Sequence, residues 1–271
     1  NLHTVCEEAH CPNVAECWGG GTATFMLMGD TCTRGCRFCA VTSGKPGALD
    51  PMEPLKISRA IAELKLKYAV ITSVDRDDLP DGGAHHFAST IRTAKSLHPE
   101  GLIEVLIPDF QGDEAAIRKI IEAKPDVIAH NVETVRRLTP GVRDRRATYD
   151  QTLEVHRFVK RENPKQYTKS SIMLGLGETD EELEECFRDL RAAGVDVLTL
   201  GQYLRPSAWH LPVQEYVPPA RFEDLKTRAE GHGFLYVASG PLVRSSYKAA
   251  EFFVEGLLRQ AKGAPPAAGL G

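Results

Sequence analysis

The sequence predicts an α/β fold, a partial TIM barrel built from six βα units, (βα)6. At 271 residues, with 42% hydrophobic and 26% charged residues, the chain is long enough to bury one substantial core. Beyond residue 20, short apolar runs alternate with amphipathic helical patterns, which is typical of parallel strands joined by helices. Six such runs stand out, which indicates a barrel or part of one.

The six predicted strands follow one another along the chain. They are residues 24–29, 68–73, 103–108, 126–131, 170–175 and 196–201, and the apolar run 234–239 is a candidate seventh. The segments between them have helical periodicity. One helix is expected to begin at Asp113, a good N-cap, and another at the capping box formed by Thr179 and Glu182.

The chain divides into three predicted parts. Residues 1–23 form an amino-terminal segment with one group of cysteines, 24–205 form the barrel, and 206–271 form a carboxy-terminal extension. We expect this extension to fold over the barrel mouth. The tail from Gly263 is rich in Gly, Ala and Pro and is expected to be disordered.

Charge and hydropathy exclude two classes of partner. The formal net charge is −4, and acidic and basic residues are interleaved, so no basic surface for nucleic acid is indicated. No apolar run is long enough to span a bilayer. We therefore expect neither nucleic acid nor membrane as a partner, and a cytoplasmic location, or an organellar one if a targeting segment has been removed.

Six of the seven cysteines lie in two groups near the amino terminus. They are Cys6, Cys11 and Cys17 in the first group and Cys32, Cys36 and Cys39 in the second. An odd count in a chain of this length favours metal or redox chemistry over a disulfide scaffold. The seventh, Cys186, lies on the apolar stripe of a predicted helix and is expected to be a small buried side chain.

The second group lies directly after the first predicted strand, in the segment "GDTCTRGCRFCAV". In parallel α/β barrels, catalytic groups gather in the loops after the carboxyl ends of the strands. A structural zinc site needs four ligands, which His3 or His10 could complete for the first group. A four-iron cluster on three thiolates leaves one iron open to a small molecule, which suits an active-site loop better.

The CxxxCxxC spacing, with Phe38 before the last cysteine, resembles the signature of the radical S-adenosylmethionine (SAM) enzymes. The resemblance implies a [4Fe-4S] cluster on Cys32, Cys36 and Cys39 whose open iron chelates SAM. It also implies one-electron cleavage of SAM to a 5′-deoxyadenosyl radical, and an electron donor such as ferredoxin or flavodoxin.

Two further motifs are similar to those of the lipoyl synthase family: "CEEAHCPNVAEC" at residues 6–17 and "RSSY" at residues 244–247. Four other segments extend the resemblance over most of the chain: "TSVDRDDLPDGGAHHF", "HNVETV", "SIMLGLGET" and "TLGQYLRPS". This family inserts sulfur at carbons 6 and 8 of an octanoyllysine on a lipoyl carrier domain. The resemblance further implies a monomer.

The same resemblance implies a second [4Fe-4S] cluster, consumed as the sulfur donor. Its ligands would be Cys6, Cys11, Cys17 and the hydroxyl of Ser245, with Ser246 as the alternative. An oxygen ligand suits such iron less well than a thiolate and could leave more easily. From the residues alone, a serine before an amphipathic run is equally explained as a helix N-cap.

Resemblance and position together indicate contacts for the nucleoside of SAM. Asn131 and Glu133 follow the fourth strand, where an amide and a carboxylate suit a ribose diol, although they could simply cap the next helix. Leu204 follows the sixth strand and is expected to line the adenine site through its backbone. Phe38 lies within the cluster loop itself and is counted with the cofactor contacts.

Other residues are expected to contact the methionyl part of SAM. Thr72 and Ser73 end the second strand and offer oxygen acceptors to the ammonium. Arg143 and Lys169 are the basic residues that could offset the carboxylate. The alternative for the first pair is strand termination, and for the second it is solvated surface charge.

Other readings of the motifs fail or compete. Twelve residues counted from Asp75 end on His86 and not on Glu, so the acidic "DRDDLPDGG" run is not an EF-hand. "GLGET" lacks the third glycine of a dinucleotide fingerprint. Two rival functions stay open at this point: a sulfur-inserting radical enzyme of the biotin synthase type, and a non-enzymatic binding domain stabilised by zinc.

Overall fold

The structure is a computed structural model that describes residues 3–4 and 20–245. Several predictions concern residues outside these ranges, namely Cys6, Cys11, Cys17, Ser246 and the tail from Gly263. Ser245 is the last residue described.

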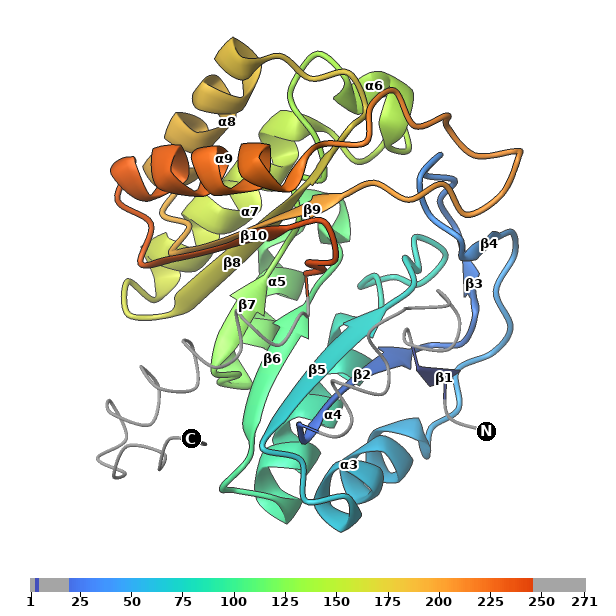
Figure 1. The fold of residues 1–271 in the computed structure, drawn as a ribbon. Coiled ribbons are helices and arrows are strands. Elements are labelled where there is room, and N and C mark those ends of the chain that lie inside the picture. Colours follow the sequence, from blue (N-terminus) through green and yellow to red (C-terminus); the bar gives the residue numbers. More distant parts are fainter. Residues whose placement is uncertain (1–2, 5–19, 246–271) are drawn as a thin grey trace.

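One sheet organises the molecule (Figure 1), with strand order β1-β2-β5-β6-β7-β8-β9-β10. The strands are β1 (His3–Thr4), β2 (Thr22–Leu27), β5 (Tyr68–Ser73), β6 (Leu102–Leu106), β7 (Val127–Ala129), β8 (Tyr167–Leu174), β9 (Val197–Gln202) and β10 (Tyr236–Gly240). All neighbouring strands are parallel, except that β1 is antiparallel to β2. The two edge strands, β1 and β10, are not paired with each other, so the barrel is open.

This topology confirms the α/β partial barrel. Each of the six predicted strands is present, and the candidate seventh is confirmed as β10. The sheet therefore extends beyond six units, since β10 continues it on one side and β1 on the other.

Helices follow most strands and cover the outside of the sheet (Figure 1). They are α3 (Glu53–Glu63), α4 (Ala84–Leu97), α5 (Glu114–Glu122), α6 (Thr139–Val142), α7 (Tyr149–Glu162), α8 (Asp180–Ala192) and α9 (Pro219–Gly231), with a short 3-10 turn η1 (Phe110–Gly112). The predicted caps are confirmed. Asp113 accepts from the N–H of Ala115, and Thr179 and Glu182 form a complete capping box.

Alternation along the strands separates two apolar layers. Side chains such as Ile71 and Val105 face outward and pack against α3, α4 and α5. The inward-facing residues at the amino ends of the strands form a smaller cluster that includes Tyr68, Leu102 and Val127. Because this cluster fills the base of the barrel, the space for chemistry lies at the opposite, carboxyl end of the strands.

Among the described residues, no helix is both long enough and apolar enough to cross a membrane.

Candidate active site

The three thiols of the second cysteine group lie in the loop between β2 and α3. This loop contains a small sheet of β3 (Thr31–Cys32) and β4 (Thr42–Ser43), which positions Cys32. Burial raises the pKa of Cys32, Cys36 and Cys39 to about 11, and the charge of each thiolate acts on another of the three. The structure therefore brings the three thiols together, half-buried and free of disulfide bonds.

Backbone N–H groups point at two of these sulfur atoms. Cys32 Sγ accepts from the N–H of Arg34 at 3.4 Å and of Asp75 at 3.3 Å. Cys36 Sγ accepts from the N–H of Asp144 at 3.3 Å. Such donors stabilise negative charge on a thiolate and are a feature of iron–sulfur sites.

The three thiols of the loop suit a four-iron cluster. Among the described residues, no group of three or more His, Cys, Asp or Glu side chains is arranged to hold a single metal ion. A four-iron cluster places each thiolate on a different iron, so three spaced thiols with N–H donors suit it.

Arg34 anchors the cluster loop from within. Its side chain is 3% exposed, and it donates two hydrogen bonds to Asp109 at 2.7 and 2.8 Å and two to Asp77 at 2.8 and 2.9 Å. Asp75 lies 3.4 Å from its Nε. Because these carboxylates follow β5 and β6, the guanidinium fork ties the loop to two strand ends.

A second anchor reaches the loop from the segment after α6. Asp144 accepts from the N–H of Gly35 at 3.0 Å, and Arg146 donates to the carbonyl of Thr33 at 2.8 Å. Arg146 also lies 3.0 Å from Asp77, which joins the two anchors. The cysteine loop is thus held on both sides before any cofactor binds.

Sequence reasoning missed these anchoring residues: Arg34, Asp77, Asp109, Asp144 and Arg146. The available signal was the placement of charge, since an arginine inside the cysteine motif faces a strand end with three nearby aspartates. This placement indicates that the arginine takes part in a network of ion pairs. It does not indicate which carboxylates belong to that network.

Replacing Arg34 tests the anchor. In Arg34→Met the buried carboxylates lose their partner, which we expect to cost about 3–5 kcal/mol of folding free energy and to lower the iron bound per chain. Arg34→Lys should recover only part of the folding free energy and of the bound iron, because an ammonium cannot make the paired hydrogen bonds. Thermal unfolding and iron analysis measure both effects. Arg59→Met, on the exposed face of α3, is the control, and an Arg34→Met protein with normal iron and stability would contradict the role.

Asn131 and Glu133 lie together just past β7. Asn131 Nδ2 donates to Glu133 Oε1 at 3.1 Å, and Asn131 Oδ1 is buried with no partner among the described residues. The backbone of Glu133 has a positive φ of 67° and bonds to Ser171 and Met173 of β8 at 2.9 Å each. Burial raises the pKa of Glu133, and its charge acts on Cys39, so the pair stands beside the cluster loop with an unsatisfied acceptor.

Arg143 is buried in the same region. Its Nη1 donates to Thr152 Oγ1 at 2.7 Å, while its Nε is buried with no partner in the described ranges. It directly precedes Asp144, whose N–H donates to Cys36 Sγ at 3.3 Å, and its charge acts on both Cys36 and Glu133, so it belongs to the site. A buried cation with an unused N–H is suited to an anionic group of a ligand.

The remaining predicted contacts lie at the carboxyl ends of their strands. Thr72 Oγ1 donates to the carbonyl of Leu106 at 3.0 Å, and Ser73 Oγ is buried without a partner in the part of the chain described. Phe38 packs against an apolar cluster, and Leu204 lies two residues after β9 and is 43% exposed. Their roles toward SAM stay predictions.

Lys169 lies apart from these residues. Its ammonium is 2.9 and 3.0 Å from the carboxylate of Glu104, and both side chains are 1% exposed. Tyr68 donates to the same carboxylate at 2.5 Å. Lys169 pairs in register with Ala129 and Val197 toward the amino end of β8, so it belongs to the base of the barrel and is neutralised there. It is not surface charge, and we omit it from the proposed SAM site.

The segment that ends in Ser245 turns back over the sheet. The carbonyl of Val243 lies so near Gly201 that a Cβ there would stand 2.1 Å from its oxygen. Arg244 Nη1 also donates to the carbonyl of Gln202 at 3.4 Å. The half-buried Ser245 therefore follows a segment packed against the carboxyl end of β9, and the folding of the whole extension over the barrel mouth stays a prediction.

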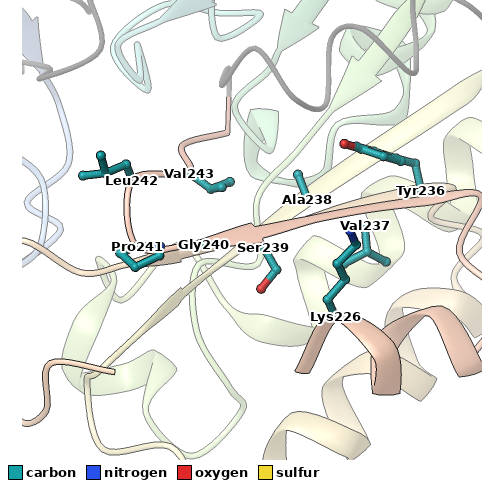
Figure 2. A pocket seen from close by; sticks show the side chains of 9 residues that line it. All are labelled: Lys226, Tyr236, Val237, Ala238, Ser239, Gly240, Pro241, Leu242 and Val243. Atoms are coloured by element: carbon teal, nitrogen blue, oxygen red, sulfur yellow. The ribbon is translucent and has the colours of Figure 1, made fainter. Parts of the chain in front are cut away.

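A separate pocket lies along the edge strand (Figure 2). It is lined by Lys226 of α9, by β10 and by the turn at 241–243. None of the predicted site residues lines it, so it is no part of this site.

Comparison with known proteins agrees with this geometry. The model of the Radical SAM superfamily matches residues 26–190. The chain is 63% identical over 259 residues to the lipoyl synthase of Myxococcus xanthus, covering 96% of this chain and 87% of that protein. It is 68% identical over 256 residues to the lipoyl synthase of Anaeromyxobacter dehalogenans, covering 94% and 87%. It is 58% identical over 264 residues to the mitochondrial lipoyl synthase of Aedes aegypti, covering 95% and 67%.

Solved structures share the fold at low sequence identity. Methylornithine synthase is 14% identical with a TM-score of 0.56, covering 91% of this chain and 83% of that one. The FeFe-hydrogenase maturase HydG from Carboxydothermus hydrogenoformans is 12% identical with a TM-score of 0.61, covering 90% and 66%. At these identities the likeness concerns the fold alone.

Proposed function

The chain belongs to the lipoyl synthase family of radical SAM enzymes, and from this premise we propose how its residues carry out the reaction. The enzyme replaces hydrogen with sulfur at carbons 6 and 8 of an octanoyl chain. Because no side chain is a strong enough base to remove a proton from such carbons, the reaction requires a radical. The observation that carries the proposal is the half-buried triplet of Cys32, Cys36 and Cys39 at a strand end, with N–H donors on two of its sulfur atoms.

The three thiolates would hold a [4Fe-4S] cluster, which supplies one electron to SAM when both are bound. Arg143 would place its unused Nε–H against the methionyl carboxylate, while the oxygens of Thr72 and Ser73 would accept from the ammonium. Arg143 would thus hold the negative carboxylate, and the oxygens of Thr72 and Ser73 would hold the positive ammonium. Together they would fix the orientation of SAM.

Asn131 and Glu133 would hold the ribose. Glu133 can accept from both hydroxyls, and Oδ1 of Asn131 adds an acceptor that has no partner among the residues the structure describes. Phe38 would flank the nucleoside from the cluster loop, and Leu204 would line the adenine through its backbone alone, since its side chain is 43% exposed.

We propose that Cys6, Cys11, Cys17 and Ser245 hold a second [4Fe-4S] cluster that donates the sulfur. Two features support this. The strands β1 and β10 are the two edges of the open barrel, and in sequence Cys6 comes two residues after β1 and Ser245 five residues after β10. The chain before Ser245 is also turned back across the end of β9. An oxygen donor on this cluster would leave more readily than a fourth thiolate.

The partners and the location of the enzyme are also proposals. The substrate would be the octanoyllysine of a lipoyl carrier domain, and a ferredoxin or flavodoxin would supply electrons. We propose that the enzyme works as a monomer in the cytoplasm, or in an organelle if a targeting segment has been removed. Identity to lipoyl synthases over most of the chain favours this function over a biotin synthase type enzyme or a zinc-stabilised binding domain.

The ribose site offers a direct test. Glu133→Gln keeps the shape of the side chain but removes the charge, so each hydroxyl loses a charge-assisted bond, and SAM affinity should fall about tenfold or more. Isothermal titration calorimetry of the reconstituted protein under anaerobic conditions measures the affinity for SAM. Glu154→Gln, exposed on α7, serves as the control. Unchanged SAM affinity in Glu133→Gln would remove the residue from the nucleoside site.

The reaction itself is tested with an octanoyllysyl peptide, SAM and dithionite under anaerobic conditions. Mass spectrometry should show 5′-deoxyadenosine and a peptide carrying two sulfur atoms. A protein with full iron content could form 5′-deoxyadenosine and yet add no sulfur to the peptide. That result would refute the proposed sulfur insertion and leave the proposed SAM cleavage intact.

A further inference from the structure

We infer that the loop after β9, together with Arg37, is a docking surface for a small acidic one-electron carrier protein. The inference rests on the proposed [4Fe-4S] cluster at Cys32, Cys36 and Cys39, and it assigns the place where the electron enters. The surface consists of Arg37, Leu204, Arg205, Trp209 and Tyr216 and is called the entry surface below.

The loop beneath the entry surface is bonded directly to the cysteine loop. His210 Nε2 lies 2.9 Å from the carbonyl of Cys39, which can only accept, so this nitrogen carries the proton. Its Nδ1 then accepts from the hydroxyl of Ser207 at 2.8 Å. The N–H of Leu211 also donates to the carbonyl of Arg37 at 3.2 Å. The loop is therefore bonded to the backbone of two residues of the cysteine loop, Arg37 and Cys39.

Large apolar side chains of this loop face the solvent. Trp209 is 71% exposed, Tyr216 is 74% exposed and Leu204 is 43% exposed. The indole of Trp209 meets the ring of His210 edge-on, with centroids 5.2 Å apart and planes at 89°. A partner seated on Trp209 is thus separated from Cys39 by two aromatic rings in contact. Exposed aromatic groups gathered in one loop are typical of an interaction surface.

The charge of the entry surface is positive, although the chain has a net charge of −4. Arg37 and Arg205 are both exposed, and neither has a carboxylate partner within the ranges the structure describes. Arg205 donates to the carbonyls of His210 and Ala208, which holds its guanidinium beside Trp209. Such a surface complements an acidic partner and speeds its encounter.

The two arginines are bonded to neighbouring residues of this loop. The carbonyl of Arg37 accepts from the N–H of Leu211 at 3.2 Å, and Arg205 Nε donates to the carbonyl of His210 at 2.8 Å. The hydroxyl of Tyr203 donates to the carbonyl of Leu211 at 2.9 Å. Arg37 and Arg205 are therefore both tied to the short stretch that is bonded to the cysteine loop.

An electron carrier suits this surface better than the substrate domain. The octanoyl carbons must reach the interior, where the proposed SAM groups Asn131, Glu133 and Arg143 are buried or half-buried. Trp209 is exposed to solvent instead, and it contacts the ring of His210, which bonds to the carbonyl of Cys39. An electron can cross that layer, whereas an alkyl chain cannot. In the step itself, the carrier is oxidised by one electron and the cluster is reduced by one, with no proton transferred.

The experiment measures reduction of the reconstituted cluster by prereduced flavodoxin in an anaerobic stopped-flow instrument, through the loss of visible absorbance. We expect Trp209→Ala and Arg37→Glu each to lower the second-order rate constant about tenfold or more at low salt. Rising salt should slow the wild type steeply and Arg37→Glu little, because the attraction is screened. Arg59→Glu on α3 makes the same charge change far from the surface and should match the wild type.

Iron content and reduction by dithionite should be unchanged in Trp209→Ala, which excludes damage to the cluster. Wild-type rates with flavodoxin in both variants would overturn the inference. Weaker binding of an octanoylated carrier domain with normal flavodoxin rates would overturn it too, and would assign the surface to the substrate. A wild-type protein that binds no cluster would refute the proposed function, and that is seen before any flavodoxin is added.

Discussion

Cys36→Ala is expected to abolish the formation of 5′-deoxyadenosine. Two thiolates, Cys32 and Cys39, are too few to hold a four-iron cluster with one open iron, so SAM has neither its binding site nor its electron. The loss also leaves the N–H of Asp144 without the sulfur it donates to at 3.3 Å. Chromatographic detection of 5′-deoxyadenosine, with dithionite as reductant, should show less than about one thousandth of the wild-type rate, a barrier increase of about 4 kcal/mol.

The control for this variant is another cysteine of the chain. Cys186 lies on α8 and is fully buried in an apolar cluster that contains none of the loop cysteines. Cys186→Ala should therefore lose about 1 kcal/mol of folding free energy and keep SAM cleavage. Full cleavage activity in Cys36→Ala would refute the ligand assignment.

A cysteine of the first group should behave in the opposite way. Cys11→Ala removes a ligand of the proposed sulfur-donating cluster and leaves the second group intact. We expect 5′-deoxyadenosine to form with an octanoyllysyl peptide but no sulfur to enter it. Sulfur-containing product from this variant would show that the sulfur comes from elsewhere.

Much of the fold could be predicted because its signals are local. Strands such as 68–73 are continuous apolar runs, as expected when both faces of a parallel sheet are covered. The capping box at Thr179 marks a helix start within four residues of sequence. The placement of the cysteine loop at the barrel mouth then follows, because parallel strands bring their carboxyl ends to one edge.

The anchors of the cysteine loop could not be predicted, because their partners are distant in sequence. Arg34 binds Asp109 across 75 positions, and Gly35 binds Asp144 across 109. Composition reveals that such charges exist and not which of them meet. Only the order of the strands brings these loops together.

Lys169 is a second residue whose environment could not be predicted from the sequence. A lysine near a strand reads as a surface or ligand-binding charge, and its burial depends on the register that sets it opposite Glu104 inside the barrel. With Tyr68 on the same carboxylate, the pair is satisfied where water is excluded. A sequence pattern does not contain that register.

Ser245→Ala is expected to uncouple SAM cleavage from sulfur insertion. The variant should retain the cluster on Cys32, Cys36 and Cys39 and form 5′-deoxyadenosine, because none of those ligands is touched. It should lose the only oxygen donor proposed for the second cluster, and lipoyl product should fall more than about tenfold. Single-turnover assays with an octanoyllysyl peptide measure both products. Ser245→Cys should also depress sulfur transfer, because a thiolate would hold the iron more firmly than an oxygen does.

Gly201→Ala separates the ligand role from a purely local one. A Cβ at Gly201 would stand 2.1 Å from the carbonyl oxygen of Val243, so the segment before Ser245 must move although the hydroxyl is kept. If Ser245 has to reach the second cluster, Gly201→Ala should lose lipoyl product as Ser245→Ala does. Normal product from Ser245→Ala with loss in Ser246→Ala would move the ligand by one residue. Normal product from both serine variants would leave RSSY as a helix cap, and Gly201→Ala would then act through packing alone.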